Sequence, residues 1–156
     1  MKKLIFIALA ILLSGCFSAF DQTIEYRVDP RVVQFVDRFY TEAEARGVVI
    51  ERYNLIVIVQ PHNTGRFVDQ NDPTAEIVGL SIRQGEQRIV FIDERYVEFK
   101  DRVDLNLEQL VFHELGHALL GKHHDENSFS VMNTDFNIEF YYKENIRKEV
   151  LDNLFY

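Results

Sequence analysis

The spacing of hydrophobic residues predicts a helix near the start of the chain. Asp29-Pro30 is typical of a helix start, with a capping aspartate followed by proline at the first helical position. The apolar residues that follow fall on one helical face: Val32, Phe35, Val36, Phe39 and Tyr40. Gly47 is expected to end this helix, because glycine readily adopts the backbone conformation found after a last helical turn.

Continuous apolar runs in the middle of the chain predict strands. The β-branched runs 48–50 and 55–59 are two of them, and the second is expected to be buried on both faces. A polar loop over 61–75 separates them from strands over 76–83 and 88–92, which a turn around Gly85 would join.

The second half of the chain predicts two more helices. Residues 105–120 form an apolar helical pattern, and residues 121–137 have no regular period. Residues 138–155 predict a closing helix whose apolar side carries Tyr142, Ile146, Val150, Leu151 and Leu154. This order of elements predicts an α/β (α+β) domain: a small, twisted mixed sheet with an N-terminal helix, a central helix and a C-terminal helix.

The first residues of the chain have the pattern of an export signal. Lys2 and Lys3 precede an apolar run, Leu4 to Leu13, which is too short to span a bilayer. Leu13-Ser14-Gly15-Cys16 resembles the lipobox of bacterial lipoproteins, in which the cysteine is acylated after cleavage. The alternative is an ordinary signal peptide with a chance cysteine. We therefore expect a signal peptide at 1–15, a tether at 16–28 and one domain at 29–156.

The net charge and the single cysteine limit which partners and which cross-links we expect for the chain. The chain has a formal net charge of −8, and removing Lys2 and Lys3 leaves 15 basic and 25 acidic residues, or 15 − 25 = −10. An acidic surface disfavours nucleic acid and anionic lipid as partners. Because Cys16 is the only cysteine, no disulfide can form within the chain. The expected location is the bacterial cell envelope, anchored by lipid, and Phe17 after the cysteine favours the outer membrane of a diderm.

Most of the histidines lie in one short segment, which starts with His113-Glu114-Leu115-Gly116-His117. Histidines four residues apart on a helix lie about one turn apart on one face, so both imidazoles can reach a single metal ion. Glu114 points about 100° around the helix from His113, where it can serve as a general base beside the metal. The alternative is a surface helix with two solvated histidines.

The continuation of this segment resembles the extended zinc signature of the metzincin metallopeptidases. In that signature a glycine, here Gly121, turns the chain toward a third histidine. Gly121 lies one residue farther from His117 than the spacing of the family signature requires. The third histidine of the signature therefore corresponds to His123 if the spacing is counted from His117, and to His124 if it is counted from Gly121. We favour His124, because the turn at the glycine sets where the next side chains point. Ser130-Val131-Met132-Asn133 resembles the Met-turn of the same family, although Met132 could also be an ordinary core residue.

The resemblance implies a zinc endopeptidase that acts on protein or peptide substrates. His113, His117 and His124 would hold Zn²⁺, Glu114 would be the catalytic base, and the strand at 88–92 or its hairpin partner would bind the substrate. Asp125 is either a hydrogen-bonding group near the site or a loop residue, and isolated His62 is expected to be exposed. Two other functions are open: a non-catalytic metal-binding lipoprotein, and an inactive peptidase fold that binds partners.

Overall fold

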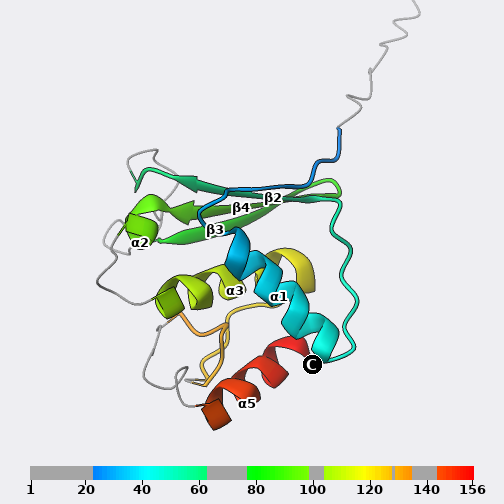
Figure 1. The fold of residues 1–156 in the computed structure, drawn as a ribbon, viewed down its shortest axis with the longest axis vertical. Coiled ribbons are helices and arrows are strands. Elements are labelled where there is room, and N and C mark those ends of the chain that lie inside the picture. Colours follow the sequence, from blue (N-terminus) through cyan, green and yellow to red (C-terminus); the bar gives the residue numbers. More distant parts are fainter. Residues whose placement is uncertain (1–22, 63–76, 99–103, 128, 135–143) are drawn as a thin grey trace, which may run out of the picture.

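The computed structural model describes residues 23–62, 77–98, 104–127, 129–134 and 144–156. Together these residues form a mixed α/β structure (Figure 1). Its strands are β1 (Arg27–Val28), β2 (Leu55–Gln60), β3 (Gly79–Gln84) and β4 (Gln87–Asp93). Its helices are α1 (Val33–Ala45), α2 (Glu94–Glu98), α3 (Asp104–Leu120) and α5 (Glu144–Phe155).

The four described strands form one mixed sheet in the order β1-β2-β4-β3. β2 is parallel to both β1 and β4, whereas β3 runs antiparallel to β4. The hairpin between β3 and β4 turns at Gly85, whose φ of +60° suits glycine. β3 therefore lies at the edge of the sheet and β4 is internal.

Helices α1 and α3 cover one face of this sheet, and α5 packs beneath them, as Figure 1 shows. Alternate residues of β2 point into the layer between sheet and helices, so Leu55, Val57 and Val59 are buried. The helices meet around Phe39, whose ring lies 5.2 Å from that of Phe112 and 5.1 Å from that of Phe155. Burial of this apolar layer holds α3 against the sheet.

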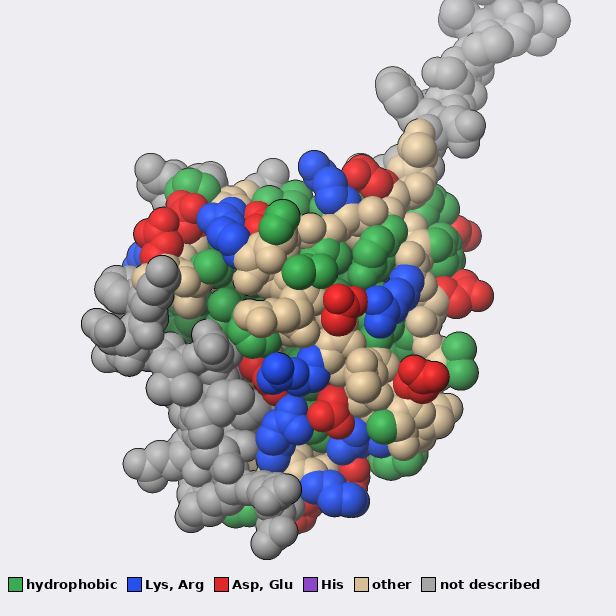
Figure 2. Space-filling view, in the orientation of Figure 1, with side chains coloured by type: hydrophobic (Ala, Val, Ile, Leu, Met, Phe, Trp, Pro, Cys, Tyr) green, Lys and Arg blue, Asp and Glu red, His purple; other side chains and the backbone are tan. Residues whose placement is uncertain are grey.

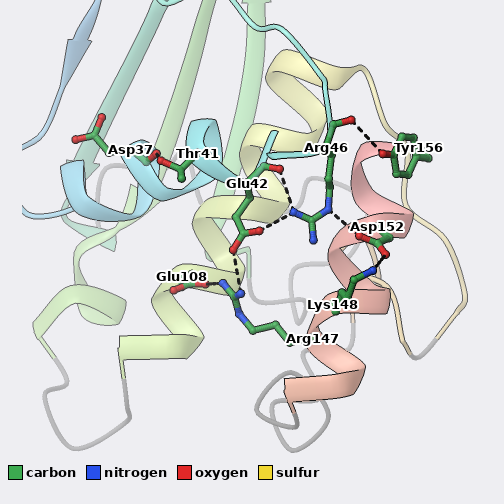
Figure 3. A network of polar contacts seen from close by, with 9 residues as sticks. All are labelled: Asp37, Thr41, Glu42, Arg46, Glu108, Arg147, Lys148, Asp152 and Tyr156. Atoms are coloured by element: carbon green, nitrogen blue, oxygen red, sulfur yellow. Dashed lines mark hydrogen bonds and ion pairs between the residues drawn. The ribbon is translucent and has the colours of Figure 1, made fainter. Parts of the chain in front are cut away.

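Polar contacts also hold the helices together (Figure 3). Glu108 of α3 has no exposed surface and pairs with Arg38 of α1 and Arg147 of α5. Arg147 also contacts Glu42 of α1. At the other end of α5, Arg46 bridges Glu42 and Asp152, at 2.6 and 2.9 Å. Each of the three helices thus contributes charge to one network.

The predicted helices are confirmed where the structure describes them, α1 with a later start, while 138–143 of the closing helix lie outside the described residues. α1 starts at Val33 after a turn in which the Asp29 carboxylate accepts the backbone N–H of Arg31, and Gly47 follows the helix with φ of +74°. α3 covers the predicted 105–120. Val150, Leu151 and Leu154 of α5 are buried, whereas Tyr142 and most of the loop at 61–75 lie outside the described residues.

The predicted strand at 48–50 is wrong. These residues have no regular structure, and Val49 is 93% exposed. A β-branched run forms a strand only where a neighbour can pair with it. Both sides of β2 are already occupied, by β1 on one side and β4 on the other. The pairing strand is instead Arg27–Val28, within the segment expected to be a tether.

The surface of the described part has mixed charge. On the face shown in Figure 2, basic and acidic side chains are interspersed over the helical layer, and no histidine is visible. No helix among the described residues has the length and hydropathy needed to cross a membrane.

Candidate metal centre

Helix α3 places two histidines on one face. His113 is 4% exposed, and His117, one turn later, is partly buried. Their Nε2 atoms lie 3.1 Å apart, and their rings meet edge to face. The four-residue spacing therefore brings both imidazoles to one point, as predicted from the helical period.

A third imidazole approaches the same point from the loop that follows α3. Gly121 has φ of +66°, and the N–H of Lys122 donates to the carbonyl of Gly116, which reverses the chain at the helix end. The loop then places His124 Nε2 at 3.1 Å from His113 Nε2. The geometry thus groups His124 with His113 and His117, while His123 is exposed and outside the cluster.

Backbone carbonyls determine which nitrogen of each helical histidine carries the proton. His113 Nδ1 lies 2.8 Å from the carbonyl oxygen of Val131, and His117 Nδ1 lies 2.7 Å from that of Lys122. A carbonyl oxygen only accepts hydrogen bonds, so each Nδ1 must donate. Both Nε2 atoms therefore keep a free lone pair directed toward the shared point, as a metal ligand requires.

The arrangement fits a tetrahedral metal ion such as zinc. Nitrogen ligands at the usual Zn–N distance of about 2.0–2.1 Å lie roughly 3.3 Å from one another in a tetrahedron. The Nε2 atoms of His117 and His124 each lie 3.1 Å from that of His113, close to that value, and all three ligand atoms lie within 4.8 Å of one another. Burial lowers the pKa of His113 to about 4 and also lowers the pKa of His117, so both rings are neutral and able to bind a metal at neutral pH.

Glu114 lies against the first residue of the edge strand. It is 5% exposed, and burial alone raises the pKa of its carboxyl group to about 8. A Cβ added at Gly79 would lie 2.8 Å from Glu114 Cδ, too close for any side chain there unless the glutamate moved. Gly79 thus lets the carboxyl group lie directly on the backbone of β3. A glycine inside a strand pattern, such as Gly79 in the predicted strand at 76–83, is the sequence signal of such a close approach.

Met132 lies in the turn beneath α3. It is 3% exposed, and a Cβ added at Gly116 would come 2.6 Å from its sulfur. Ser130 closes the turn: its hydroxyl accepts the N–H of Met132 and donates to Asp125. Asp125 lies in the loop that carries His124, and its contact with Ser130 connects this loop to the turn that contains Val131. The carbonyl of Val131 in turn orients His113.

Other candidate residues lie apart from this cluster or outside the described residues. His62 is half-exposed and lies 2.7 Å from the buried carboxylate of Asp93, at the ends of β2 and β4. The signal peptide at 1–15 and Cys16 fall on residues that the structure does not describe, so the lipid anchor and the envelope location stay predictions.

We expect His124→Ala to weaken zinc binding far more than His123→Ala. Loss of a supporting group beyond the ligands already lowers metal affinity by about 10- to 100-fold, so loss of one of three ligands should exceed about 100-fold. His123 does not belong to the cluster, so its replacement should leave the affinity unchanged. Competition for zinc against a coloured chelator measures both. Equal losses in the two variants would contradict the assignment of His124.

Comparison of the chain with protein-family models, with curated proteins and with solved structures finds no match in any of the three. What the chain does must therefore be argued from its own residues.

Proposed function

We propose that this chain is a zinc-dependent metalloendopeptidase of the metzincin type. The observation that carries the proposal is the convergence of three imidazole nitrogens beside a buried glutamate, next to the edge of a sheet. Three protein ligands leave one position of a tetrahedral ion for water or substrate, whereas structural zinc sites usually have four. Within the described residues, these histidines form the only group of three or more His, Cys, Asp or Glu that could hold a metal ion.

The edge strand supplies the second part of the proposal. Among the described residues β3 pairs with β4 along one side only, so the backbone groups of its other side would be available to an extended peptide. Gly79, the first residue of β3, lies on Glu114. A peptide added to this edge would thus pass close to the glutamate. Of the two strands expected to bind substrate, 88–92 and its hairpin partner, the strand order favours the hairpin partner, β3.

Each residue has a separate chemical role. A bound zinc ion supplies Lewis acidity toward the peptide carbonyl and the attacking water. The three histidines hold it, and the Val131 and Lys122 carbonyls keep two of them in the metal-binding tautomer. Glu114 accepts the proton of the attacking water and returns it to the leaving amine nitrogen. The positive charge of a zinc ion held by the histidines would lower the raised pKa of Glu114. The carboxyl group would then be ionised beside the metal, where it can act as a base.

Removal and return of the metal tests this function. The purified protein should contain about one zinc ion per chain, as a three-histidine site requires. A chelator should abolish hydrolysis of a denatured protein substrate, and stoichiometric zinc should restore it. Elemental analysis and gel assay measure the two quantities. Tight zinc binding without any hydrolysis would refute the peptidase and favour a metal-binding lipoprotein.

A further inference from the structure

A depression with a volume of about 360 Å³ lies beside the candidate metal centre. It runs between the last turn of α3 and the C-terminal half of β3, and His117 forms part of its wall. Its other lining residues include Ser81, Arg83, Arg88, Leu120 and Gly121. None of its described lining residues is acidic. A substrate that crosses the metal centre along β3 would pass this depression.

Two arginines face each other in it. Arg83 of β3 and Arg88 of β4 are directly paired in the antiparallel register, so their side chains leave the same face of the sheet. Like charges directly opposite one another on a sheet are destabilising. Within the part of the chain that the structure describes, their hydrogen bonds go only to carbonyl oxygens of the hairpin turn: Arg83 Nε donates to Gly85, and Arg88 Nη1 to Gly85 and Glu86. Neutral oxygens do not compensate either charge.

The pair is exceptional among the described arginines. Each of the others forms an ion pair with a carboxylate: Arg27, Arg31, Arg38, Arg46, Arg52, Arg95 and Arg147. The chain as a whole has a net charge of −8. In so acidic a protein, carboxylates are plentiful as partners, so two adjacent guanidinium groups that pair with no carboxylate of the described residues, beside a candidate active site, indicate a place for an anion from outside.

We propose that Arg83 and Arg88 bind an acidic side chain of the substrate, which makes this protein a peptidase selective for acidic sequences. The inference rests on the proposed peptidase function and adds its substrate class. Guanidinium groups bind carboxylates through two parallel hydrogen bonds, so a paired site favours Asp and Glu over neutral residues.

Strand direction indicates on which side of the cleaved bond this residue lies. β3 runs from Gly79, against Glu114, to Arg83 near the end of α3. A peptide that pairs antiparallel to β3, the slightly more stable pairing, runs the opposite way. The residues that precede the cleaved bond therefore lie along Arg83. At about 3.4 Å per residue, the acidic residue falls within roughly four positions of that bond.

The test compares peptides that differ at one position. Glu, Gln or Lys is placed in turn at each of roughly four positions before the cleaved bond, and kcat/KM is measured for the wild type and for the double variant Arg83→Gln/Arg88→Gln. We expect the wild type to prefer Glu over Gln by about ten-fold at one position, and the double variant to lose that preference. The control variant Arg27→Gln removes an arginine at the opposite edge of the sheet and should retain the preference for Glu over Gln. A wild type with equal rates, or a double variant that still prefers Glu, overturns the proposal.

Two further measurements separate this proposal from the peptidase proposal and from a folding defect. Arg83→Glu should shift the preference from the Glu peptide toward the Lys peptide, which a folding defect cannot produce. Fluorescence anisotropy of the same labelled peptides with zinc-loaded wild type detects binding without cleavage. Suppose that no peptide is hydrolysed, that the wild type binds the Glu peptide about ten-fold more tightly than the Gln peptide, and that the double variant loses this difference. The peptidase proposal then fails, and the arginine site stands. Equal binding of both peptides refutes the arginine site.

Discussion

Replacing Glu114 with glutamine is expected to slow peptide hydrolysis by about a thousand-fold while zinc content stays at the wild-type level. General bases contribute about 10²–10⁴-fold to enzymatic rates, and the amide of glutamine cannot accept the proton of the attacking water. The three imidazoles that would hold the metal are untouched by the substitution. The loss should therefore appear in kcat, measured on a fluorogenic peptide, together with zinc analysis of the same sample.

The same substitution has a pH-dependent effect on the metal-free protein. Burial raises the pKa of Glu114 from 4.5 to about 8, so the folded chain keeps the proton in a pH range where the unfolded chain has lost it. The contribution of Glu114 to the free energy of unfolding should thus fall as pH rises from about 4.5 through 8, and the difference in unfolding free energy between the wild type and Glu114→Gln isolates it from the opposite contribution of the buried histidines. Glu114→Gln lacks this titration and should be the more stable protein at neutral pH and above.

Glu126→Gln provides the matched control for both measurements. Glu126 lies in the loop near the metal centre, but it is exposed. Its replacement removes one carboxylate from the same region without touching the buried site. We expect Glu126→Gln to hydrolyse the peptide at the wild-type rate and to contain as much zinc as the wild type. Full hydrolysis by Glu114→Gln would refute its role as the base, and loss of zinc would show that the glutamate supports the metal site instead.

Replacing Glu108 with glutamine is expected to lower the free energy of unfolding by about 3 kcal/mol. Breaking a buried ion pair on one side costs about 3–5 kcal/mol, because the remaining charge loses its partner. Glu108 has no exposed surface and pairs with two arginines, from α1 and α5. The lower end of the range applies, since Arg147 keeps its ion pair with Glu42, and Arg38 is 47% exposed, so water can solvate it after the change.

Urea unfolding of the metal-free protein measures this loss, because zinc binding would otherwise stabilise the folded state and mask it. Glu149→Gln in α5 is the control: Glu149 is exposed, so we expect its unfolding midpoint to match that of the wild type. If Glu108→Gln unfolds within about 0.5 kcal/mol of the wild type, the network in Figure 3 does not hold α3 in place.

Local patterns predicted much of the metal centre. Residues four apart on a helix are neighbours whatever surrounds them, so His113 and His117 could be placed on one face from spacing alone. Gly121 marked the chain reversal for the same local reason, and counting from it selected the histidine that joins the cluster. The helical and strand periods likewise predicted most elements, with ends that shifted by a few residues.

Pairing between distant segments could not be predicted in this way. The run at 48–50 has strand propensity but no free neighbour, and Arg27–Val28 takes the place beside β2 instead. The approach of Gly79 to Glu114, and the carbonyl of Val131 that orients His113, join residues far apart in the sequence. Spacing along the chain carries no information on such contacts.

The amino-acid sequence by itself determined which side chains can carry metal chemistry and that two of them share a helical face, because helix geometry depends only on neighbours along the chain. Only the tertiary structure decided that β3 is the edge strand of the described sheet beside Glu114, that Glu108 joins three helices, and that Arg83 and Arg88 share a face with no carboxylate partner among the described residues. These features depend on strand order, register and packing, which are properties of the whole fold.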